Sequence, residues 1–318
     1  MDGHTGTDFT GASHTGADLN GAVRKEADPA GGDCSRSAKV RALVLTGFGL
    51  NCDVETAHAF ELAGARADRV HINRVVSSVV DINDYHILAF GGGFSWGDDH
   101  GAGVIQALKI KKHLGDKLIS FVSGGKLVIG ICNGFQTLVN LGLLPGLGGD
   151  YRSRNVALTW NDCGNFRDQW VHLHVNQENP SPFTRGLDNF ELPVRHAQGK
   201  FVTAPDILET LKDQGQIVLR YGDGEGRPAR GKFPLNPNGS MDDIAGICDA
   251  TGQVFGLMPH PEAYLHFTNH PDWTVKKERL KRIGFSNKHH QEHKNMGTPG
   301  LMIFKNAVAY AAQKFDSP

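Results

Sequence analysis

Short apolar runs alternate with helically spaced segments in the first part of the chain, from about residue 40 to residue 141. Each run has the length of a buried strand, and several end in a glycine-rich turn. The expected strands are residues 40–45, 70–76, 87–90 and 127–131, and the expected helices are residues 54–65, residues 104–114 and a segment starting near residue 135. This order predicts an α/β fold with an open, mostly parallel sheet and helices on both faces.

The second part of the chain has shorter strands and more turn formers, such as Asn179-Pro180 and Asn236-Pro-Asn-Gly239. The expected strands here are residues 156–160, 170–175, 194–196, 217–221, 244–249 and 254–258. We expect them to form antiparallel hairpins added to the parallel sheet within the same domain. An apolar-periodic helix over residues 301–310 is expected to close the chain and pack on the sheet.

The first 38 residues differ in character from the rest. They are polar and glycine-rich, and His4-Thr-Gly-Thr-Asp-Phe9 nearly recurs as His14-Thr-Gly-Ala-Asp-Leu19. So few large apolar side chains cannot offset the entropy cost of ordering, which predicts a disordered tail over residues 1–38. Residues 39–318 are then predicted to form one domain.

A polar insertion is predicted within that domain, at residues 265–297. A solvated helix followed by a loop is the expected structure. His289, His290 and His293 cluster in it, but neither a cysteine nor a paired carboxylate accompanies them. We therefore expect no designed metal site there, nor elsewhere in the chain.

Composition narrows the classes of function. The chain has 318 residues, 39% of them hydrophobic, and a formal net charge of -1, so no general attraction to nucleic acid or to an anionic membrane is expected. Neither a membrane-length apolar run nor a signal-peptide pattern is present in the sequence. The five cysteines are scattered without a Cys-x-x-Cys pair, which argues against a zinc or disulfide framework and favours a reducing, cytoplasmic location.

The most informative motif is Gly130-Ile-Cys-Asn-Gly134, directly after the expected strand 127–131. Glycines two positions either side of a cysteine are typical of a nucleophile elbow, a strained turn between a strand and a helix. Glycine is needed where a side chain would clash in that turn. A helix N-terminus also favours thiolate over thiol, so Cys132 is the candidate nucleophile. The alternative is a free cysteine packed in a structural turn.

A base for this nucleophile is predicted in Met258-Pro-His-Pro-Glu262, after the expected strand 254–258. Prolines fix the backbone φ angle, so the turn should be stiff. Extended geometry would place His260 and Glu262 on the same side, with Glu262 accepting from one imidazole nitrogen while the other faces the thiol. Alone, the segment could be a structural turn.

Attack on an amide creates an oxyanion, which backbone N–H groups must stabilise. In elbow geometry Asn133 supplies one N–H. The triple glycine 91–93 follows the expected strand 87–90, and Gly93 is the expected second donor. A phosphate-binding turn is the alternative for this loop, but a Gly-Lys-Ser/Thr sequence does not follow it.

Together, Gly-Ile-Cys-Asn-Gly-Phe-Gln, Gly-Gly-Phe-Ser-Trp-Gly-Asp and Met-Pro-His-Pro-Glu resemble class I, triad-type glutamine amidotransferases with a flavodoxin-like fold. The chain is most similar to the glutaminase subunits of phosphoribosylformylglycinamidine synthases, over roughly residues 40–264 and 298–312. Leu50-Asn-Cys-Asp-Val-Glu55 and Leu143-Leu-Pro-Gly146 also match that family, and residues 236–247 are its most specific part.

The resemblance implies that Cys132 attacks the side-chain amide of glutamine, that His260 transfers protons and that Glu262 orients His260. It implies that Gln136 and the loop bearing Gly92, Phe94 and Ser95 help to hold glutamine. Ammonia would pass to a separate ATP-dependent synthetase subunit that makes formylglycinamidine ribonucleotide in purine biosynthesis, and a small accessory subunit often joins the complex. ATP and magnesium would bind that partner, so no cofactor is expected in this chain.

Two departures from the family pattern concern docking and activation. Ala263 stands where the family usually has arginine, and the family's His-Gly-Glu-Gly-Arg/Lys motif reads His196-Ala-Gln-Gly-Lys200. Two alternatives therefore stay open, namely an amidase or glutaminase that serves another synthetase, and a docking subunit that is not catalytic.

Overall fold

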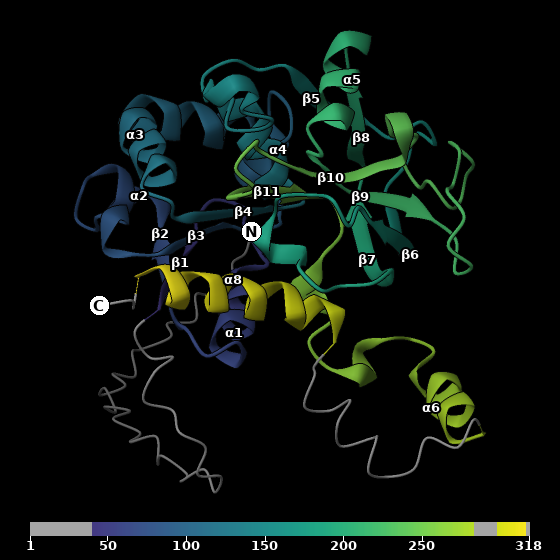
Figure 1. The fold of residues 1–318 in the computed structure, drawn as a ribbon. Helices are drawn as coiled ribbons and strands as arrows, with labels where there is room; N and C mark the ends of the chain where they lie inside the picture. Colours follow the sequence, from purple (N-terminus) through teal and green to yellow (C-terminus); the bar gives the residue numbers. More distant parts are fainter. Residues whose placement is uncertain (1–39, 283–297, 316–318) are drawn as a thin grey trace, which may run out of the picture. The chain divides into compact units, whose positions relative to one another are not determined.

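The computed structural model describes residues 40–282 and 298–315 (Figure 1). The predicted tail, with His4 and His14, lies outside the described residues, as does the histidine cluster at 289–293. The disordered tail and the domain boundary at residue 39 therefore stay predictions. Among the described helices, none is long and apolar enough to cross a membrane.

A nine-stranded sheet, in the order β2-β1-β3-β4-β11-β10-β9-β6-β7, organises the described residues. Its strands are β1 (Arg41–Thr46), β2 (Arg66–His71), β3 (Ile87–Phe90), β4 (Leu127–Ile131), β6 (Arg167–Val175), β7 (Phe190–His196), β9 (Ile217–Gly222), β10 (Ile244–Cys248) and β11 (Val254–Leu257). The pairs from β2 to β11 are parallel, and those from β11 to β7 are antiparallel. The predicted mostly parallel sheet with added antiparallel strands is thus confirmed.

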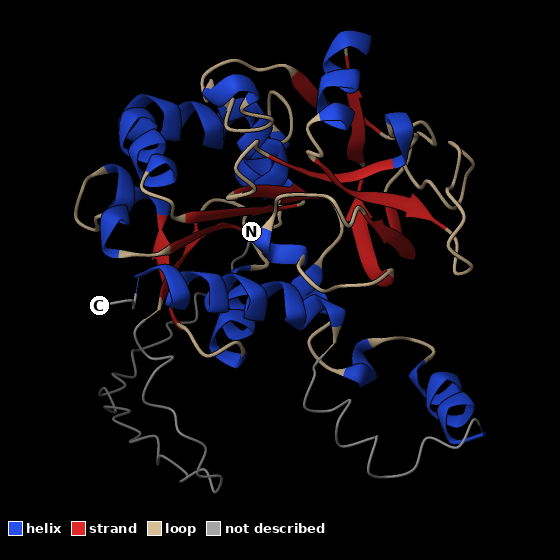
Figure 2. Ribbon diagram, in the orientation of Figure 1, coloured by secondary structure: helices blue, strands red, loops and turns tan. Residues whose placement is uncertain are grey.

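Helices cover both faces of the parallel half (Figures 1 and 2). One face carries α1 (Asp53–Leu62) and α8 (Pro299–Phe315), which meet through edge-to-face packing of Phe60 on Phe304 at 4.9 Å between ring centroids. The other face carries α2 (Ile72–Val76), α3 (Val104–Ser123) and α4 (Asn133–Leu141). Because β4 lies between these layers, all five of its residues are buried, as expected for a central parallel strand.

The expected strand over residues 70–76 is wrong. The strand β2 is an edge strand that begins at Arg66. Its sequence is mostly polar, so it contains no apolar run that would predict a strand. It ends at His71, whose Nδ1 atom accepts a hydrogen bond from the Asn73 N–H and caps α2. Ile72 and Val75 lie three positions apart and are buried on one side of that helix.

Besides α2, two further elements were not predicted. The strand β8 (Gln198–Thr203) pairs with β5 (Val156–Trp160) in a separate two-stranded sheet, and α5 (Pro205–Asp213) follows it. Leu211 of α5 is buried, and Ile207 and Leu208 pack partly buried against the core, so this short helix is amphipathic. Within the predicted insertion, α6 (Trp273–Arg282) has no buried residue, which agrees with a solvated helix.

Candidate active site

Three adjacent parallel strands end at the same edge of the sheet, and their ends carry most of the predicted site. Phe90 of β3 pairs in register with Gly130 of β4, and Ile131 of β4 pairs with Leu257 of β11. The glycine loop, Cys132 and the His260 turn follow directly from these strands. In open α/β sheets this carboxyl edge is where ligands bind.

Cys132 has the backbone geometry of an elbow. Its φ and ψ angles are 52° and -106°, a sparsely populated region that costs on the order of 1–3 kcal/mol for a non-glycine residue. The neighbouring structure leaves no room for flanking side chains. A Cβ atom on Gly130 would lie 2.6 Å from Leu138 Cδ1, and one on Gly134 would lie 1.9 Å from the Phe90 carbonyl oxygen. The predicted need for both glycines is confirmed.

His260 and Glu262 form a buried pair, with 2.5 Å between His260 Nδ1 and Glu262 Oε1. The backbone conformation that brings the two side chains together differs from the prediction. Residues Pro261–Ala263 form a 3₁₀ turn rather than extended chain, and the fixed φ of Pro261 is compatible with the first position of that turn. The His260 N–H donates to the Pro193 carbonyl at 2.8 Å, which fixes the start of this turn on β7.

The charges around His260 favour its protonated form. Burial lowers the pKa of His260, but the Glu262 carboxylate and then Cys132 more than offset that effect, and the pKa lies well above its usual value. The Nε2 atom is buried and has no hydrogen-bond partner among the described residues. His260 therefore uses Nδ1 for Glu262 and keeps Nε2 for another group.

Strand β7 contributes to the site in a way that sequence reasoning missed. The Cys132 thiol donates to the Arg195 carbonyl at 3.6 Å, so β7 contacts both the predicted nucleophile and the predicted base. His196, the next residue, is buried and makes a 3.1 Å contact with Asn161 Oδ1 through Nδ1. Burial, and then the nearby His260, lower the pKa of His196 to about 3, so it is neutral at physiological pH. In the sequence, the unusual motif at 196–200 was the signal that could have indicated this contribution of β7.

The glycine loop is held against the loop after β1. The N–H of Phe94 donates to the Gly49 carbonyl at 2.8 Å, and that of Asn51 donates to the Gly92 carbonyl at 3.2 Å. Those two bonds use the neighbours of Gly93 rather than Gly93 itself. Gly93 has φ of 142°, and a Cβ atom there would lie 2.6 Å from the Gly49 carbonyl oxygen, so only glycine fits.

Asn133 connects this loop to the elbow helix through its side chain. Its Oδ1 atom accepts from the Ser95 N–H at 3.2 Å, and its Nδ2 atom donates to Asp98 Oδ1 at 2.9 Å and to Gln136 Oε1 at 3.1 Å. As the first residue of α4, Asn133 has a backbone N–H without a partner inside the helix. Burial raises the pKa of Asp98, and the bond from Asn133 partly offsets that rise.

The residues predicted to hold glutamine differ in their exposure and in the hydrogen bonds that they already make within the protein. Ser95 is buried, and its Oγ atom has no hydrogen-bond partner among the described residues. Phe94 is 44% exposed and lies 6.3 Å from Phe166 between ring centroids. Gln136 is buried and donates to the Gln198 carbonyl at 2.6 Å, so its amide is partly engaged within the protein.

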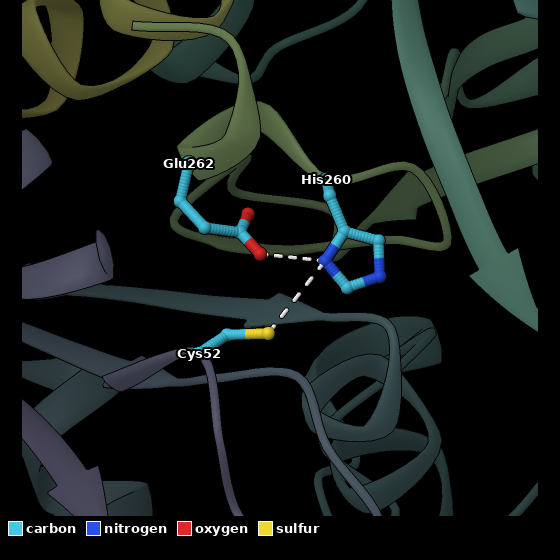
Figure 3. Close-up of side chains that lie close together, drawn as sticks. All are labelled: Cys52, His260 and Glu262. Atoms are coloured by element: carbon cyan, nitrogen blue, oxygen red, sulfur yellow. Dashed lines mark hydrogen bonds and ion pairs between the residues drawn. The ribbon is translucent and has the colours of Figure 1, made fainter. Parts of the chain in front are cut away.

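The structure brings a second thiol into the site. Cys52 Sγ lies 4.0 Å from His260 Nδ1. Figure 3 shows that Cys52 and Glu262 approach the same ring nitrogen. A Cβ atom on Gly92 would lie 3.1 Å from this sulfur and 2.8 Å from His260 Cε1. From the sequence, Cys52 was expected only as part of a loop that resembles the family, because its contact with His260 spans 208 residues.

Known proteins are similar to this chain over most of its length. Residues 39–311 match the family described as CobB/CobQ-like glutamine amidotransferase domain. Phosphoribosylformylglycinamidine synthase subunit PurQ of Methanococcus maripaludis is 46% identical over 270 residues, covering 85% of this chain and 97% of that protein. The subunit of the same name from Dehalococcoides mccartyi is 41% identical over 276 residues, covering 87% and 99%.

A solved structure is also similar. The structure of PurLQS from Thermotoga maritima contains a chain with 29% sequence identity and a TM-score of 0.60, and the match covers 86% of this chain and 99% of that one.

Proposed function

Because this chain belongs to the glutamine amidotransferases, in the family of phosphoribosylformylglycinamidine synthase PurQ subunits, we propose that it hydrolyses glutamine to glutamate and supplies the ammonia to a synthetase that makes formylglycinamidine ribonucleotide. The observation that carries the proposal is the strained Cys132 elbow beside the buried His260–Glu262 pair, at the ends of two adjacent parallel strands.

In the first step, the Cys132 thiolate attacks the side-chain amide carbon of glutamine. The raised pKa of His260 supports an imidazolium that stabilises the thiolate in the resting site. The amide oxygen becomes an oxyanion, for which the N–H groups of Asn133 and Gly93 are the proposed donors. Glu262 keeps the His260 ring oriented so that Nε2, which has no partner among the described residues, faces the reacting atoms.

In the second step, His260 delivers a proton to the departing nitrogen, the carbon–nitrogen bond breaks and ammonia leaves. A γ-glutamyl thioester remains on Cys132. Water, giving a proton to His260, attacks the thioester carbon and releases the Cys132 thiolate and glutamate, whose new carboxyl group loses its proton to solvent. One glutamine and one water thus become one glutamate and one ammonia, and the enzyme returns to its starting state.

The glycine loop and α4 are proposed to hold glutamine. Gly92 and Gly93 let the backbone come close to His260 and to the reacting amide, and the unpartnered Ser95 hydroxyl is available for a polar group of the substrate. Phe94 presents an exposed ring beside that position. Gln136 already donates to the Gln198 carbonyl and accepts from Asn133, so it contributes the remaining N–H and the remaining oxygen lone pair of its amide.

A synthetase subunit that binds ATP and magnesium, and a small accessory subunit, are the proposed partners. The name of the Thermotoga maritima structure, PurLQS, supports an assembly with such subunits. In this proposal the chain carries no cofactor of its own.

The test is glutamate release from glutamine by the full chain together with its synthetase partner, with the Cys132→Ser variant as the control. We expect the variant to lose glutamine-dependent synthesis and to keep synthesis from added ammonia. Absence of glutamate release by the unaltered complex would contradict the proposal. Loss of both activities in the variant would indicate a structural role for Cys132, and full activity without any partner would indicate a stand-alone amidase.

A further inference from the structure

Three potential metal ligands of different chemical kinds meet beside the elbow. Cys52 offers a sulfur, His260 a ring nitrogen and Glu262 a carboxylate oxygen, and these atoms all lie within 4.8 Å of one another (Figure 3). Sequence spacing could not show this cluster, because Cys52 is separated from the other two ligands by about 200 residues.

Each of the three ligands is held by backbone contacts rather than by chance surface geometry. Cys52 is the N-cap residue of α1, and its carbonyl accepts from the Thr56 N–H at 3.0 Å and from Thr56 Oγ1 at 2.6 Å. The Cys52 N–H donates to the Gly92 carbonyl at 3.4 Å. His260 and Glu262 belong to the stiff turn after β11. The ligand set is therefore largely preassembled.

A second observation also indicates a ligand. Glu262 is buried, yet its Oε2 atom has no hydrogen-bond partner among the described residues. A buried carboxylate normally fills its hydrogen-bonding capacity, because an unsatisfied buried charge is costly. Cys52 is half-buried, and its thiol has only Asn51 Oδ1, at 3.3 Å, and His260 Nδ1 as polar neighbours among the described side chains.

We propose that Cys52, His260 and Glu262 form a binding site for a zinc ion. Thiolate, imidazole and carboxylate are the three ligand types that zinc takes in proteins. The thiolate and the carboxylate together carry two negative charges, which balance the charge of Zn²⁺ in this buried place. A water molecule completes the tetrahedron.

Small movements of side chains suffice to form the site. Ideal zinc bond lengths and tetrahedral angles place sulfur and nitrogen about 3.6 Å apart and nitrogen and oxygen about 3.4 Å apart. The corresponding distances are 4.0 Å for Cys52 Sγ to His260 Nδ1 and 2.5 Å for His260 Nδ1 to Glu262 Oε1. The thiol proton and the proton between His260 and Glu262 leave to solvent when the ion binds.

Zinc bound in this way inhibits glutamine hydrolysis, and this consequence rests on the proposed function. The ion takes the Nδ1 atom of His260 and the carboxylate that orients the ring, so His260 loses the partner that raises its pKa. Cys132 is not a ligand in this arrangement. Zinc binding and catalysis thus both use His260 and Glu262, but zinc binding uses the thiol of Cys52 and catalysis uses that of Cys132.

Cobalt(II) is the probe that tests binding independently of activity, because a cobalt–thiolate bond gives a charge-transfer absorption that histidine-only sites lack. The experiment uses the full-length Cys132→Ser chain, which keeps Cys52. We expect the cobalt–thiolate band in this variant and in Cys163→Ser, and its loss in Cys52→Ser. Cys163 is the matched control, since it is another half-buried free cysteine, with contacts to Asn165 and Pro237.

Zinc titration of glutaminase activity, with each variant normalised to its own rate without metal, tests the consequence. Inhibition should weaken at least tenfold in Cys52→Ser relative to the unaltered chain and to Cys163→Ser, and a chelator should reverse it. Equal inhibition of the three proteins, or a cobalt band that needs Cys132 rather than Cys52, would overturn the site. A cobalt band at Cys52 in a chain without glutaminase activity would instead contradict the proposed function alone.

Discussion

Two cysteines lie at comparable places in the fold and differ in nearly everything that decides their chemistry. Each is the N-cap residue of a helix that follows a parallel strand, Cys52 before α1 and Cys132 before α4. Each interacts electrostatically with the same histidine, His260. The structure therefore allows the effect of local backbone on a thiol to be compared around a single base.

The difference lies in the turn that carries each thiol. The segment 47–52 lets Cys52 take an ordinary φ of -103°, whereas Cys132 follows β4 directly and is held at φ of 52°. Burial raises the pKa of Cys52, which the contact with His260 only partly offsets. Cys52 also approaches Nδ1, the nitrogen that Glu262 already occupies, and this leaves Nε2 for Cys132. In the proposed mechanism Cys132 is therefore the nucleophile, because Nε2 of His260 remains available to it.

The largest expected effect is that of Cys132→Ala. Removal of the nucleophile should lower kcat for glutamate release by about 10³-fold or more, since nucleophile removal costs about 10⁶-fold in a well-studied hydrolase. The rate is measured with the synthetase partner present, and circular dichroism shows whether the variant is folded. A folded variant that keeps more than a tenth of the activity would mean that another group attacks glutamine.

Glu262→Gln should have the next largest effect, a decrease of about 10²–10⁴-fold in kcat, because an amide can neither orient nor stabilise the imidazolium in the same way. In the unaltered protein Glu262 raises the pKa of His260, so the pKa of His260 should be lower in the variant. The limb of the pH–rate profile that reports His260 should then move to lower pH. An unchanged profile would show that Glu262 does not act through His260.

The same pair makes stability depend on pH. The pKa of His260 is higher in the folded protein than the value of about 6.5 in the unfolded chain, so protonation favours folding. This stabilisation is fully present below about pH 6.5 and is lost as the pH rises through the folded-state pKa. Urea unfolding at several pH values should show that the deficit of Glu262→Gln, relative to the unaltered protein, shrinks as the pH rises. A deficit that grows with pH would contradict this sign.

Gly134→Ala tests the strained turn that sets Cys132 apart. A methyl group there meets the Phe90 carbonyl at 1.9 Å, so we expect a loss of about 1–3 kcal/mol in the free energy of unfolding, measured with urea. Gly115→Ala is the matched control. Its Cβ atom meets nothing within 4 Å inside α3, and helix propensity predicts a gain of about 0.5–1 kcal/mol. Equal effects of both changes would show that the elbow is not tightly packed.

Cys52→Ala has the smallest expected effect on turnover, a decrease of less than tenfold in kcat without metal. Its thiol contacts the side of the imidazole that Glu262 already orients. Glutamate release with the synthetase partner is the readout, in buffer with a chelator. A decrease as large as that of Cys132→Ala would remove the distinction between the two thiols.

The parallel half of the fold and the elbow could be predicted because their signals are local. Apolar runs marked β1, β3, β4 and β11, and two glycines around a cysteine marked the turn. The polar edge strand β2 and the short helix α2 could not be predicted in this way, since pairing with β1 and the His71 cap decide them. The His260–Glu262 contact was predicted, but its 3₁₀ turn was not, because proline is compatible with either geometry.

The remaining contacts of the site depend on tertiary structure. The Arg195 carbonyl meets Cys132 only because β7 lies near the ends of β4 and β11, and Cys52 meets His260 only across the glycine loop. The most family-specific segment, at 236–247, begins as a largely buried polar turn, in which Asn238 donates to the Gly199 carbonyl at 2.9 Å, and ends in β10. Motifs therefore marked the candidate nucleophile and the candidate base, whereas the groups around them required the structure.

The most direct test of the distinction between the two thiols is covalent labelling with a glutamine analogue that carries an electrophilic carbon in place of the side-chain amide. The full chain is treated with the analogue, digested and mapped by peptide mass spectrometry. The account predicts one modification per chain, on the peptide that contains Cys132, with loss of glutaminase activity in proportion to labelling. Modification of the Cys52 peptide instead, with the same loss of activity, would contradict it.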